Sequence, residues 1–294
     1  EESGRGEEAR TARRSALELD GRCYEAQVRL ARSCADAGAS TEAERLFKKA
    51  IALRPDYPRA LEELAYFYHL HGRLDEAQAL YGRISRMTPG DPQAFFNLGA
   101  MHLLKGENAL ARRMFEKSYA IEPGSASRSN LALIYYYDGD YRRALPLHEA
   151  AARESSEHYE WGNLGDTRRQ IPGLQDQAAA AYRRAVELAE KALSARPDNP
   201  AEVLSSLALY YAHLGVKQKA LAAIARARRL APAFLPGIQR AILAYEAVGE
   251  RSLALAALRE YLERLGSIEE IKREPDLAAL RRDPAYREIV GNRP

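Results

Sequence analysis

Small apolar residues recur along the chain at a nearly constant spacing. One series of alanines is separated by steps of 34, 34, 33, 34, 42 and 34 residues, obtained by subtracting their residue numbers. The series consists of Ala43, Ala77, Ala111, Ala144, Ala178, Ala220 and Ala254. A period of this length indicates stacked supersecondary units, each of which buries its apolar face against the next.

Within one period the apolar positions follow the pitch of an α-helix. Leu61, Leu64, Ala65 and Tyr68 are spaced i, i+3, i+4 and i+7, so they share one face of a helix. A glycine five residues before the alanine predicts a left-handed cap at the end of this first helix. These glycines are Gly38, Gly72, Gly106, Gly139, Gly215 and Gly249, with Gly173 in the same role in the fifth unit.

A second helix is predicted after each glycine. It carries the alanine, a large residue four positions later and a small residue three positions after that, as in Ala43, Phe47 and Ala50. The small residues allow the two helices to approach closely, and the large side chain fills the space beside them. A proline then ends the second helix in four of the units. These prolines are Pro55, Pro89, Pro123 and Pro232.

The pattern resembles the tetratricopeptide repeat (TPR) family. A strong match combines Phe95, Leu98 and Gly99 on the first helix with Ala111 and Phe115 on the second. The resemblance covers residues 24–266 and implies an all-α, right-handed superhelical solenoid of helical hairpins. The seven expected repeats are 24–57, 58–91, 92–124, 125–157, 158–199, 201–234 and 235–266.

The segments on either side of the repeats have distinct expected roles. Residues 1–23 match only the second half of a unit, so we interpret them as the second helix of a repeat with further sequence upstream. We expect residues 267–294 to cover the apolar face of the last repeat, as solenoids require. Their sequence resembles the closing segment of TPR regions in bacterial signalling proteins, where such regions follow Ser/Thr kinase, adenylate cyclase or winged-helix domains.

The fifth unit is longer than the others, as the step of 42 residues shows. Most of the excess lengthens its second helix, which we expect to run from about Asp176 to Ala195. Two interpretations remain open. The extension is either a projection without a role or a ridge that docks a neighbouring domain.

A candidate binding surface follows from the repeat register. In stacked hairpins of this family the first helices line the concave face, and positions two, five, six, nine, twelve and thirteen of each unit face the groove. The sixth position is occupied by Arg29, Glu63, Asn97, Asn130, Asn163, Ser206 and Arg240. Three successive asparagines offer donors and acceptors to the backbone of an extended peptide. Alternatively, these amides bond only to neighbouring helices.

Aromatic and charged residues flank the asparagines at groove positions, and exposed aromatic residues are favoured anchors at binding surfaces. Tyr135 falls at a packing position and is expected in the core. The predicted peptide-binding groove comprises Asn97, Asn130, Asn163, Tyr66, His69, Phe96, Leu133, Tyr136, Tyr137, Tyr159, Asp166 and Arg169.

Charge and composition narrow the possible partners. The 44 basic and 41 acidic residues are interspersed and leave a net charge of +3, so neither nucleic acid nor an anionic membrane is expected as a partner. Arginine pairs such as 142–143 and 228–229 fall on second helices or turns, beside acidic residues. No apolar run approaches the roughly 18 residues of a membrane span. Two cysteines are too few for a disulfide framework and favour a reducing, cytoplasmic setting.

No catalytic, cofactor or metal motif stands out. The glycines are caps at repeat spacing, and no glycine-rich phosphate loop is present. His102 and His148 stand where the family usually has an aromatic residue. His69 and His71 are two residues apart, so they do not share a helix face.

The sequence therefore predicts a non-catalytic protein–protein interaction module that holds an extended peptide or protein segment in its groove. An alternative is the regulatory region of a larger bacterial signalling enzyme or transcription regulator, with the catalytic or DNA-binding domain upstream. A further possibility is self-association through uncovered end repeats.

Overall fold

The computed structural model describes residues 24–264 and 266–291, in which every regular element is a helix. The half-repeat expected at residues 1–23 lies outside the described residues. The chain divides into two compact units, residues 1–128 and 129–294, and the boundary falls within helix α8. The two units are described separately below.

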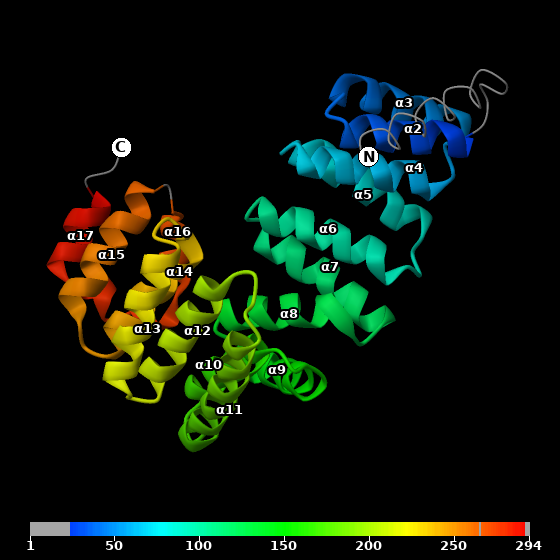
Figure 1. The fold of residues 1–294 in the computed structure, drawn as a ribbon. Coiled ribbons are helices and arrows are strands. Elements are labelled where there is room, and N and C mark those ends of the chain that lie inside the picture. Colours follow the sequence, from blue (N-terminus) through cyan, green and yellow to red (C-terminus); the bar gives the residue numbers. More distant parts are fainter. Residues whose placement is uncertain (1–23, 265, 292–294) are drawn as a thin grey trace. The chain divides into compact units, whose positions relative to one another are not determined.

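The first unit contains three helical hairpins, each made of two helices of similar length joined by a short turn (Figure 1). Its helices are α2 (Tyr24–Asp36), α3 (Ser40–Leu53), α4 (Pro58–Leu70), α5 (Leu74–Met87), α6 (Pro92–Leu104) and α7 (Asn108–Ile121).

The second unit continues the alternation of first and second helices and ends in a run of shorter elements (Figure 1). The alternating helices are α8 (Ser125–Tyr137), α9 (Tyr141–Glu154), α10 (His158–Arg169), α11 (Gln175–Ser194), α12 (Pro200–His213), α13 (Lys217–Leu230), α14 (Leu235–Ala247) and α15 (Arg251–Glu263). The shorter elements are α16 (Ile268–Arg273), the 3₁₀ turns η1 (Pro275–Leu277) and η2 (Leu280–Arg282), and α17 (Pro284–Gly291).

The periodic alanines are buried where the helices of the hairpins pack together. Each of the seven is at most 2% exposed. The large residue four positions later is also buried, as for Phe47 at 1%, Phe115 at 0% and Tyr182 at 1%. Opposite Phe115, a Cβ added at Gly99 would lie 2.9 Å from the ring, so only glycine fits that position without displacement. Close helix approach is thus determined by residue size.

The periodic glycines cap the first helices as predicted. Gly38, Gly72, Gly106, Gly139, Gly173, Gly215 and Gly249 all have positive φ, between 71° and 86°. After six of them the next backbone N–H donates to a carbonyl five residues back, as from Glu107 to His102 at 2.9 Å. This is the hydrogen bond of the Schellman motif, which satisfies a carbonyl at the helix end.

The long second helix of the fifth unit is α11, with 20 residues against 14 in α9. Its added turns are packed against the next hairpin. Ala189 is fully buried, and Glu190 accepts a hydrogen bond from the Tyr211 hydroxyl of α12. The extension therefore stabilises the contact between the fifth and sixth units and does not project alone.

The closing segment packs against the last helical hairpin. Ile271, Leu277 and Leu280 are fully buried and join a cluster with Ile238 of α14 and Leu258 of α15. Burial of such side chains stabilises a domain by roughly 1.5–3 kcal/mol each relative to exposure. The closing segment and the last hairpin thus share one apolar core.

Candidate binding cavity on the first helices

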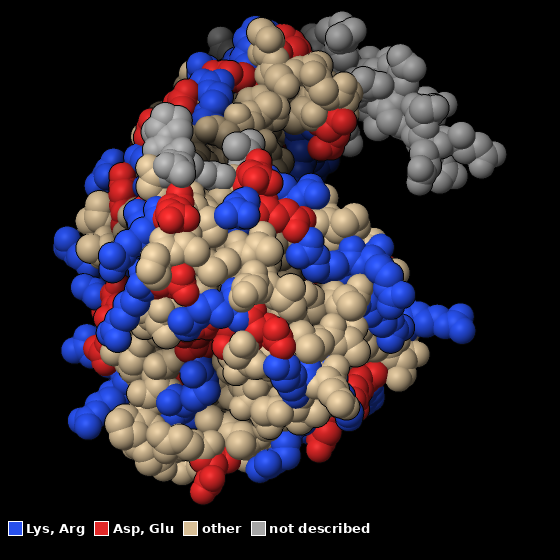
Figure 2. Space-filling model, turned by 90° about the vertical axis from the view of Figure 1, so that its left-hand side faces the viewer, with Lys and Arg blue, Asp and Glu red and all other residues tan. Residues whose placement is uncertain are grey.

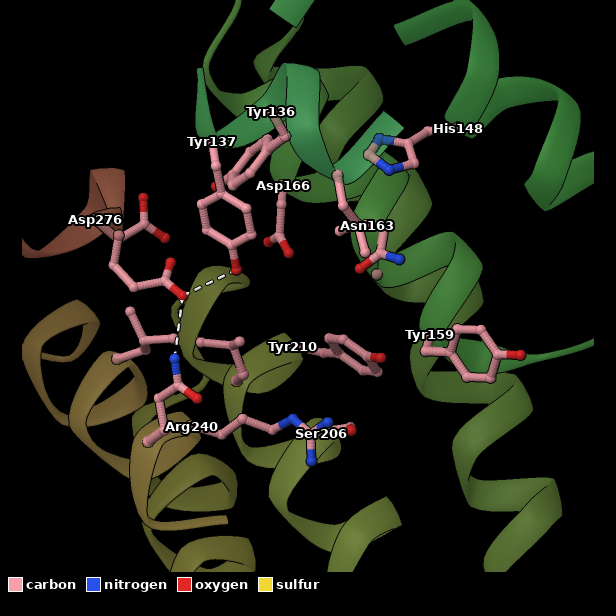
Figure 3. Close-up of a pocket in the computed structure, with 16 residues that line it drawn as sticks. Tyr136, Tyr137, His148, Tyr159, Asn163, Asp166, Ser206, Tyr210, Arg240 and Asp276 are labelled. Carbon is pink, nitrogen blue, oxygen red and sulfur yellow. Dashed lines mark hydrogen bonds between the residues drawn. The ribbon is translucent and has the colours of Figure 1, made fainter. Parts of the chain in front are cut away.

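The second unit contains a cavity of about 220 Å³ on the face formed by its first helices (Figure 3). Residues of α8, α10, α12 and α14 line it, together with His148 of α9 and two acidic residues of the closing segment. The lining residues are Leu133, Tyr136, Tyr137, His148, Tyr159, Gly162, Asn163, Asp166, Ser206, Leu209, Tyr210, Gln239, Arg240, Leu243, Glu274 and Asp276.

One face of helix α10 lines the cavity. Tyr159, Gly162, Asn163 and Asp166 are spaced i, i+3, i+4 and i+7, which places them on one side of the helix. Gly162 is required because a Cβ there would lie 2.6 Å from the ring of Tyr210 on α12. The two helices therefore approach closely enough to share one cavity.

The closing segment forms part of the cavity wall. The Tyr137 hydroxyl donates to Oε1 of Glu274 at 3.1 Å, and the Gln239 amide donates to the same oxygen at 3.4 Å (Figure 3). Asp276 accepts a hydrogen bond of 2.9 Å from the Gln170 amide and forms an ion pair with Arg169. These contacts connect the end of the array to α8 and α10.

Burial changes the acidity of two carboxyl groups at this wall. Loss of solvent, with a smaller contribution from the nearby Asp276 carboxylate, raises the pKa of Asp166 to about 6, although the Tyr182 hydroxyl donates to it at 2.6 Å. Loss of solvent also raises the pKa of Glu274 to about 7, opposed by the Tyr137 hydrogen bond. Both groups therefore exchange protons near neutral pH.

Two buried histidines lie at this part of the unit: His148 lines the cavity, and His213 contacts Asp166. Burial lowers the pKa of His148 and of His213 to about 4, so both are neutral at pH 7. Nδ1 of His148 lies 2.7 Å from the Thr167 hydroxyl. The ring of His213 stacks on Tyr182 at 4.9 Å, with Nε2 3.6 Å from the Asp166 carboxylate. His148 is thus packed in the position where the repeat pattern expects an aromatic ring.

The first unit has its own, more open cavity of about 310 Å³. Tyr66 of α4 is 54% exposed at this cavity. Asn97 of α6 also lines it, and its side-chain oxygen accepts a hydrogen bond of 2.8 Å from Gln93. The lining residues are Arg32, Glu62, Glu63, Tyr66, Tyr81, Ile84, Asp91, Gln93, Ala94 and Asn97.

The twelve predicted groove residues divide between the two units. The cavity of the second unit, called the second cavity from here on, brings together six of them. Tyr66 and Asn97 line the cavity of the first unit. The six are Leu133, Tyr136, Tyr137, Tyr159, Asn163 and Asp166. The Asn163 amide makes no hydrogen bond to a described residue and lies at the cavity surface (Figure 3).

Four predicted residues lie outside both cavities. Phe96 packs against the ring of Phe115 at 5.7 Å, and His69 lies beside Tyr66 at 6.4 Å between ring centroids. Arg169 is engaged by Asp276, and Asn130 is half-buried on α8. Tyr135, expected in the core, is 8% exposed.

Sequence reasoning missed part of the second cavity. Leu209, Gln239 and Leu243 occupy the same groove register in the sixth and seventh units, so the register rule could have identified them. Ser206 and Arg240 were assigned to the sixth groove position but were not included in the predicted peptide-binding set. Nothing in the local pattern indicated Glu274 and Asp276, because they reach the cavity through the path of the closing segment.

Surface charge, metal-ligand geometry and helix hydropathy bear on other kinds of site. On the face shown in Figure 2, basic and acidic side chains are interspersed. Arginines from the paired positions form ion pairs, such as Arg168 with Glu149 at 2.9 Å and Arg184 with Glu187 at 2.8 Å. Among residues 24–264 and 266–291, no cluster of three or more His, Cys, Asp or Glu side chains is arranged to hold a metal ion. Within the same ranges, no helix combines the length and apolar character required to cross a membrane.

Comparison with family models recognises TPR sequences in three stretches of the chain. Models described as tetratricopeptide repeat match residues 1–58, 35–100 and 125–158. Together with the observed hairpins, these matches establish TPR repeats and an all-α fold built from them.

Known proteins with similar sequences are much longer than this chain. The protein CTR9 homolog of Arabidopsis thaliana is 23% identical over 242 residues, which is 66% of this chain and 21% of that protein. The anaphase-promoting complex subunit cut9 of Schizosaccharomyces pombe is 24% identical over 182 residues, 59% of this chain and 26% of that protein. The chain therefore spans about a quarter or less of these relatives.

Solved structures share the fold at low sequence identity. The crystal structure of the APC/C hetero-tetramer Cut9–Hcn1 matches with a TM-score of 0.58 and 20% identity, covering 82% of this chain and 46% of that chain. The C-terminal part of a TPR repeat-containing protein from Cytophaga hutchinsonii matches with a TM-score of 0.60 and 16% identity, covering 81% and 95%. These matches place the fold among the helical solenoids built from TPR hairpins.

Proposed function

We propose that this chain binds an extended segment of a partner protein on the face formed by its first helices, with the cavity of the second unit as the principal site. The observation that carries the proposal is the cavity itself. It is lined by the groove positions of successive first helices and combines tyrosine rings with an uncommitted side-chain amide.

The second unit offers both kinds of group that a peptide requires. Tyr159 is 49% exposed at the cavity, and an exposed aromatic ring provides apolar contact area at little entropic cost. Asn163 can donate to a peptide carbonyl and accept from a peptide N–H at the same time. Such paired hydrogen bonds depend on the peptide backbone and tolerate many sequences.

The first unit offers a smaller set of the same kind. Tyr66 provides the exposed ring, and the Asn97 amide keeps its N–H donors for a ligand while its oxygen accepts from Gln93. We treat this face as a second, weaker contact region and Asn130 as a further candidate on α8.

The similar proteins support only a general role in protein–protein interaction. The structure of Cut9 contains a second protein, Hcn1, so that TPR protein forms a complex. The regulatory role in a larger signalling enzyme or transcription regulator remains a hypothesis. The complete coding sequence around these residues tests it, since the absence of a kinase, cyclase or winged-helix domain would contradict it.

A selection of random peptides on the purified chain tests the proposal. Enriched peptides are synthesised, and their Kd values are measured with the wild type and with Asn163→Ala. Loss of one hydrogen-bonding amide is expected to weaken binding about fivefold, which corresponds to about 1 kcal/mol. The triple variant Asn97→Ala, Asn130→Ala and Asn163→Ala is expected to lose more.

A matched control separates the groove from general effects. Gln218→Ala removes an exposed amide from the second helix α13 and is expected to leave the Kd unchanged. The proposal fails if no peptide is enriched, or if the triple variant keeps its fold and binds as tightly as the wild type.

A further inference from the structure

The second cavity has an excess of acidic groups at the end formed by the closing segment. Asp166, Glu274 and Asp276 all line this end. Arg169 pairs with Asp276, whereas no described Lys or Arg nitrogen lies within ion-pairing distance of Asp166 or Glu274. Figure 3 shows the Arg240 guanidinium beside Ser206, apart from Asp166, and it donates to the Ser205 hydroxyl at 3.1 Å. Asp166 and Glu274 thus lack a close ion pair with Lys or Arg, and the Arg169 guanidinium acts on Asp166 only at longer range, where it lowers the pKa of that carboxyl.

The neighbouring histidines do not supply the missing charge. Burial lowers the pKa of His148 and His213 to about 4, so neither is a cation at pH 7. The same loss of solvent raises the pKa of Asp166 to about 6 and that of Glu274 to about 7. Ionisation of these carboxyl groups is therefore unfavourable in the empty cavity, and a bound cation would offset that cost.

An independent observation at the cavity comes from His148. Its side chain is 1% exposed, and its Nε2 atom is buried without a hydrogen-bond partner while the residue lines the cavity. A buried polar atom left without a partner costs free energy comparable to a lost hydrogen bond. A polar ligand group reaching this part of the cavity would satisfy it.

The shape and walls of the cavity select the kind of cation. Tyr136, Tyr137, Tyr159 and Tyr210 line it, and tyrosine rings attract cations through their faces. A volume of about 220 Å³ is below the roughly 300–1,000 Å³ of pockets that enclose drug-sized ligands. The space suits one long side chain better than a complete cofactor.

We propose that the second cavity binds the cationic side chain of a lysine or arginine from the partner peptide, with Asp166 and Glu274 as the groups that pair with it. This proposal rests on the proposed function and specifies its ligand. Asn163 and Arg240, at the wall of the same cavity, then donate to the peptide backbone on either side of the basic residue.

Single-residue probes test the cavity without a partner peptide. Nα-acetyl-lysine methylamide is titrated into the ¹⁵N-labelled full chain, alongside its uncharged analogue Nα-acetyl-norleucine methylamide. The backbone amide resonances of Gly162, Asn163 and Asp166, which line the cavity on α10, report binding. We expect saturable shifts with the lysine derivative and binding at least about tenfold weaker with the norleucine derivative.

Matched variants identify the groups responsible. Asp166→Asn and Glu274→Gln remove the charges but keep the oxygens that accept from Tyr182 and from Tyr137 and Gln239. Together they are expected to weaken binding of the lysine derivative at least about fivefold. Glu187→Gln, which removes one charge from the exposed side of α11, is expected to have no effect.

Three outcomes would overturn the proposal: equal affinity for the lysine and norleucine derivatives, no saturable shift with the lysine derivative, or unchanged binding in the double variant. The comparison of the two derivatives on the wild type decides the matter even if the double variant fails to fold. Peptides selected on the groove without enrichment of Lys or Arg would overturn this proposal and leave the proposed function standing. Binding of the lysine derivative with no peptide enriched would contradict the proposed function alone.

Discussion

The Tyr137 hydroxyl donates a hydrogen bond of 3.1 Å to Oε1 of Glu274, which lies 137 residues further along the chain. The bond joins α8, the first helix of the second unit, to the segment that follows α16. The Arg273 guanidinium lies over the ring of the same tyrosine, 5.0 Å from its centroid. One side chain thus helps to hold the closing segment at the cavity.

Replacing Tyr137 by Phe removes this hydrogen bond and leaves the ring in place. We expect the free energy of unfolding to fall by about 1 kcal/mol, because the buried Glu274 oxygen keeps only the Gln239 amide as a donor. Chemical denaturation measures the loss, and hydrogen exchange should quicken at residues 268–277. Tyr119→Phe is the control, since that hydroxyl makes no hydrogen bond to a described residue. Equal stability of the two variants would show that the bond contributes nothing.

The raised pKa of Glu274 predicts a specific pH dependence of stability. Between the ordinary carboxyl pKa of 4.5 and the folded pKa of about 7, the folded chain keeps a proton that the unfolded chain has lost. The free energy of unfolding therefore decreases as pH rises through this window, by at most about 3 kcal/mol. Glu274→Gln should remove that decrease. The free energy of unfolding of the variant, minus that of the wild type, should therefore be larger above pH 7 than at pH 4.

Denaturation at a series of pH values tests this comparison of the two proteins. The quantity to follow is the difference in free energy of unfolding between variant and wild type. His148 and His213 have lowered pKa values, so both proteins become more stable as pH rises from about 4 to 6.5, and the difference cancels this effect. The other charged or titratable groups near Glu274 are Tyr137, Asp166, Glu270, Arg273 and Asp276. A difference that does not change with pH would contradict the assignment.

Gly165 and Gly82 should respond in opposite ways to substitution by alanine. A Cβ at Gly165 would lie 2.6 Å from the ring of Tyr182. That ring has no room to move, because Tyr182 is 1% exposed and its hydroxyl donates a hydrogen bond to Asp166. Gly165→Ala should destabilise the chain by about 1–3 kcal/mol through overpacking. A Cβ at Gly82 on α5 meets only a flexible arginine at 3.7 Å, so Gly82→Ala should stabilise by up to about 1 kcal/mol. Thermal unfolding of both variants measures the two signs.

Binding of the lysine derivative should strengthen with pH. A cation pairs with the ionised carboxylates, so affinity should rise as pH increases through about 6 and about 7, the pKa values of Asp166 and Glu274. The charged or titratable groups that line the cavity or lie at its wall are Asp276, Glu270, Arg169, Arg240, Arg273, His148, His213, Tyr136, Tyr137, Tyr182 and Tyr210. NMR titrations at several pH values measure the trend, and a flat profile would argue against pairing with these two groups.

The local pattern of the sequence was sufficient for much of the fold. Gly106 ends its helix in a left-handed cap, and Ala111 and Phe115 are fully buried, as the spacing predicted. These features depend on residues within one hairpin. Helix periodicity, side-chain size and backbone conformational preference act over such distances, so they can be read directly from neighbouring residues.

The sequence also predicts which positions of each first helix belong to the groove register. It does not show which of these positions are left uncovered by neighbouring side chains. Tyr159, Asn163 and Asp166 lie on one face of α10 at the cavity because helix geometry requires it. Phe96, predicted for the groove by the same rule, lies outside both cavities and contacts the ring of Phe115. Whether a groove position is open or covered depends on the side chains of neighbouring helices.

The sequence by itself determined the repeat, its helices, their caps and the face that each first helix presents, because all of these follow from short-range spacing. Only the tertiary structure decided that Glu274 and Asp276 enter the cavity beside Asp166. Asp276 meets the Gln170 amide across 106 residues of chain, and no local pattern specifies which distant side chains a closing segment will contact. The cluster of acidic groups at this end of the cavity arises from that long-range packing.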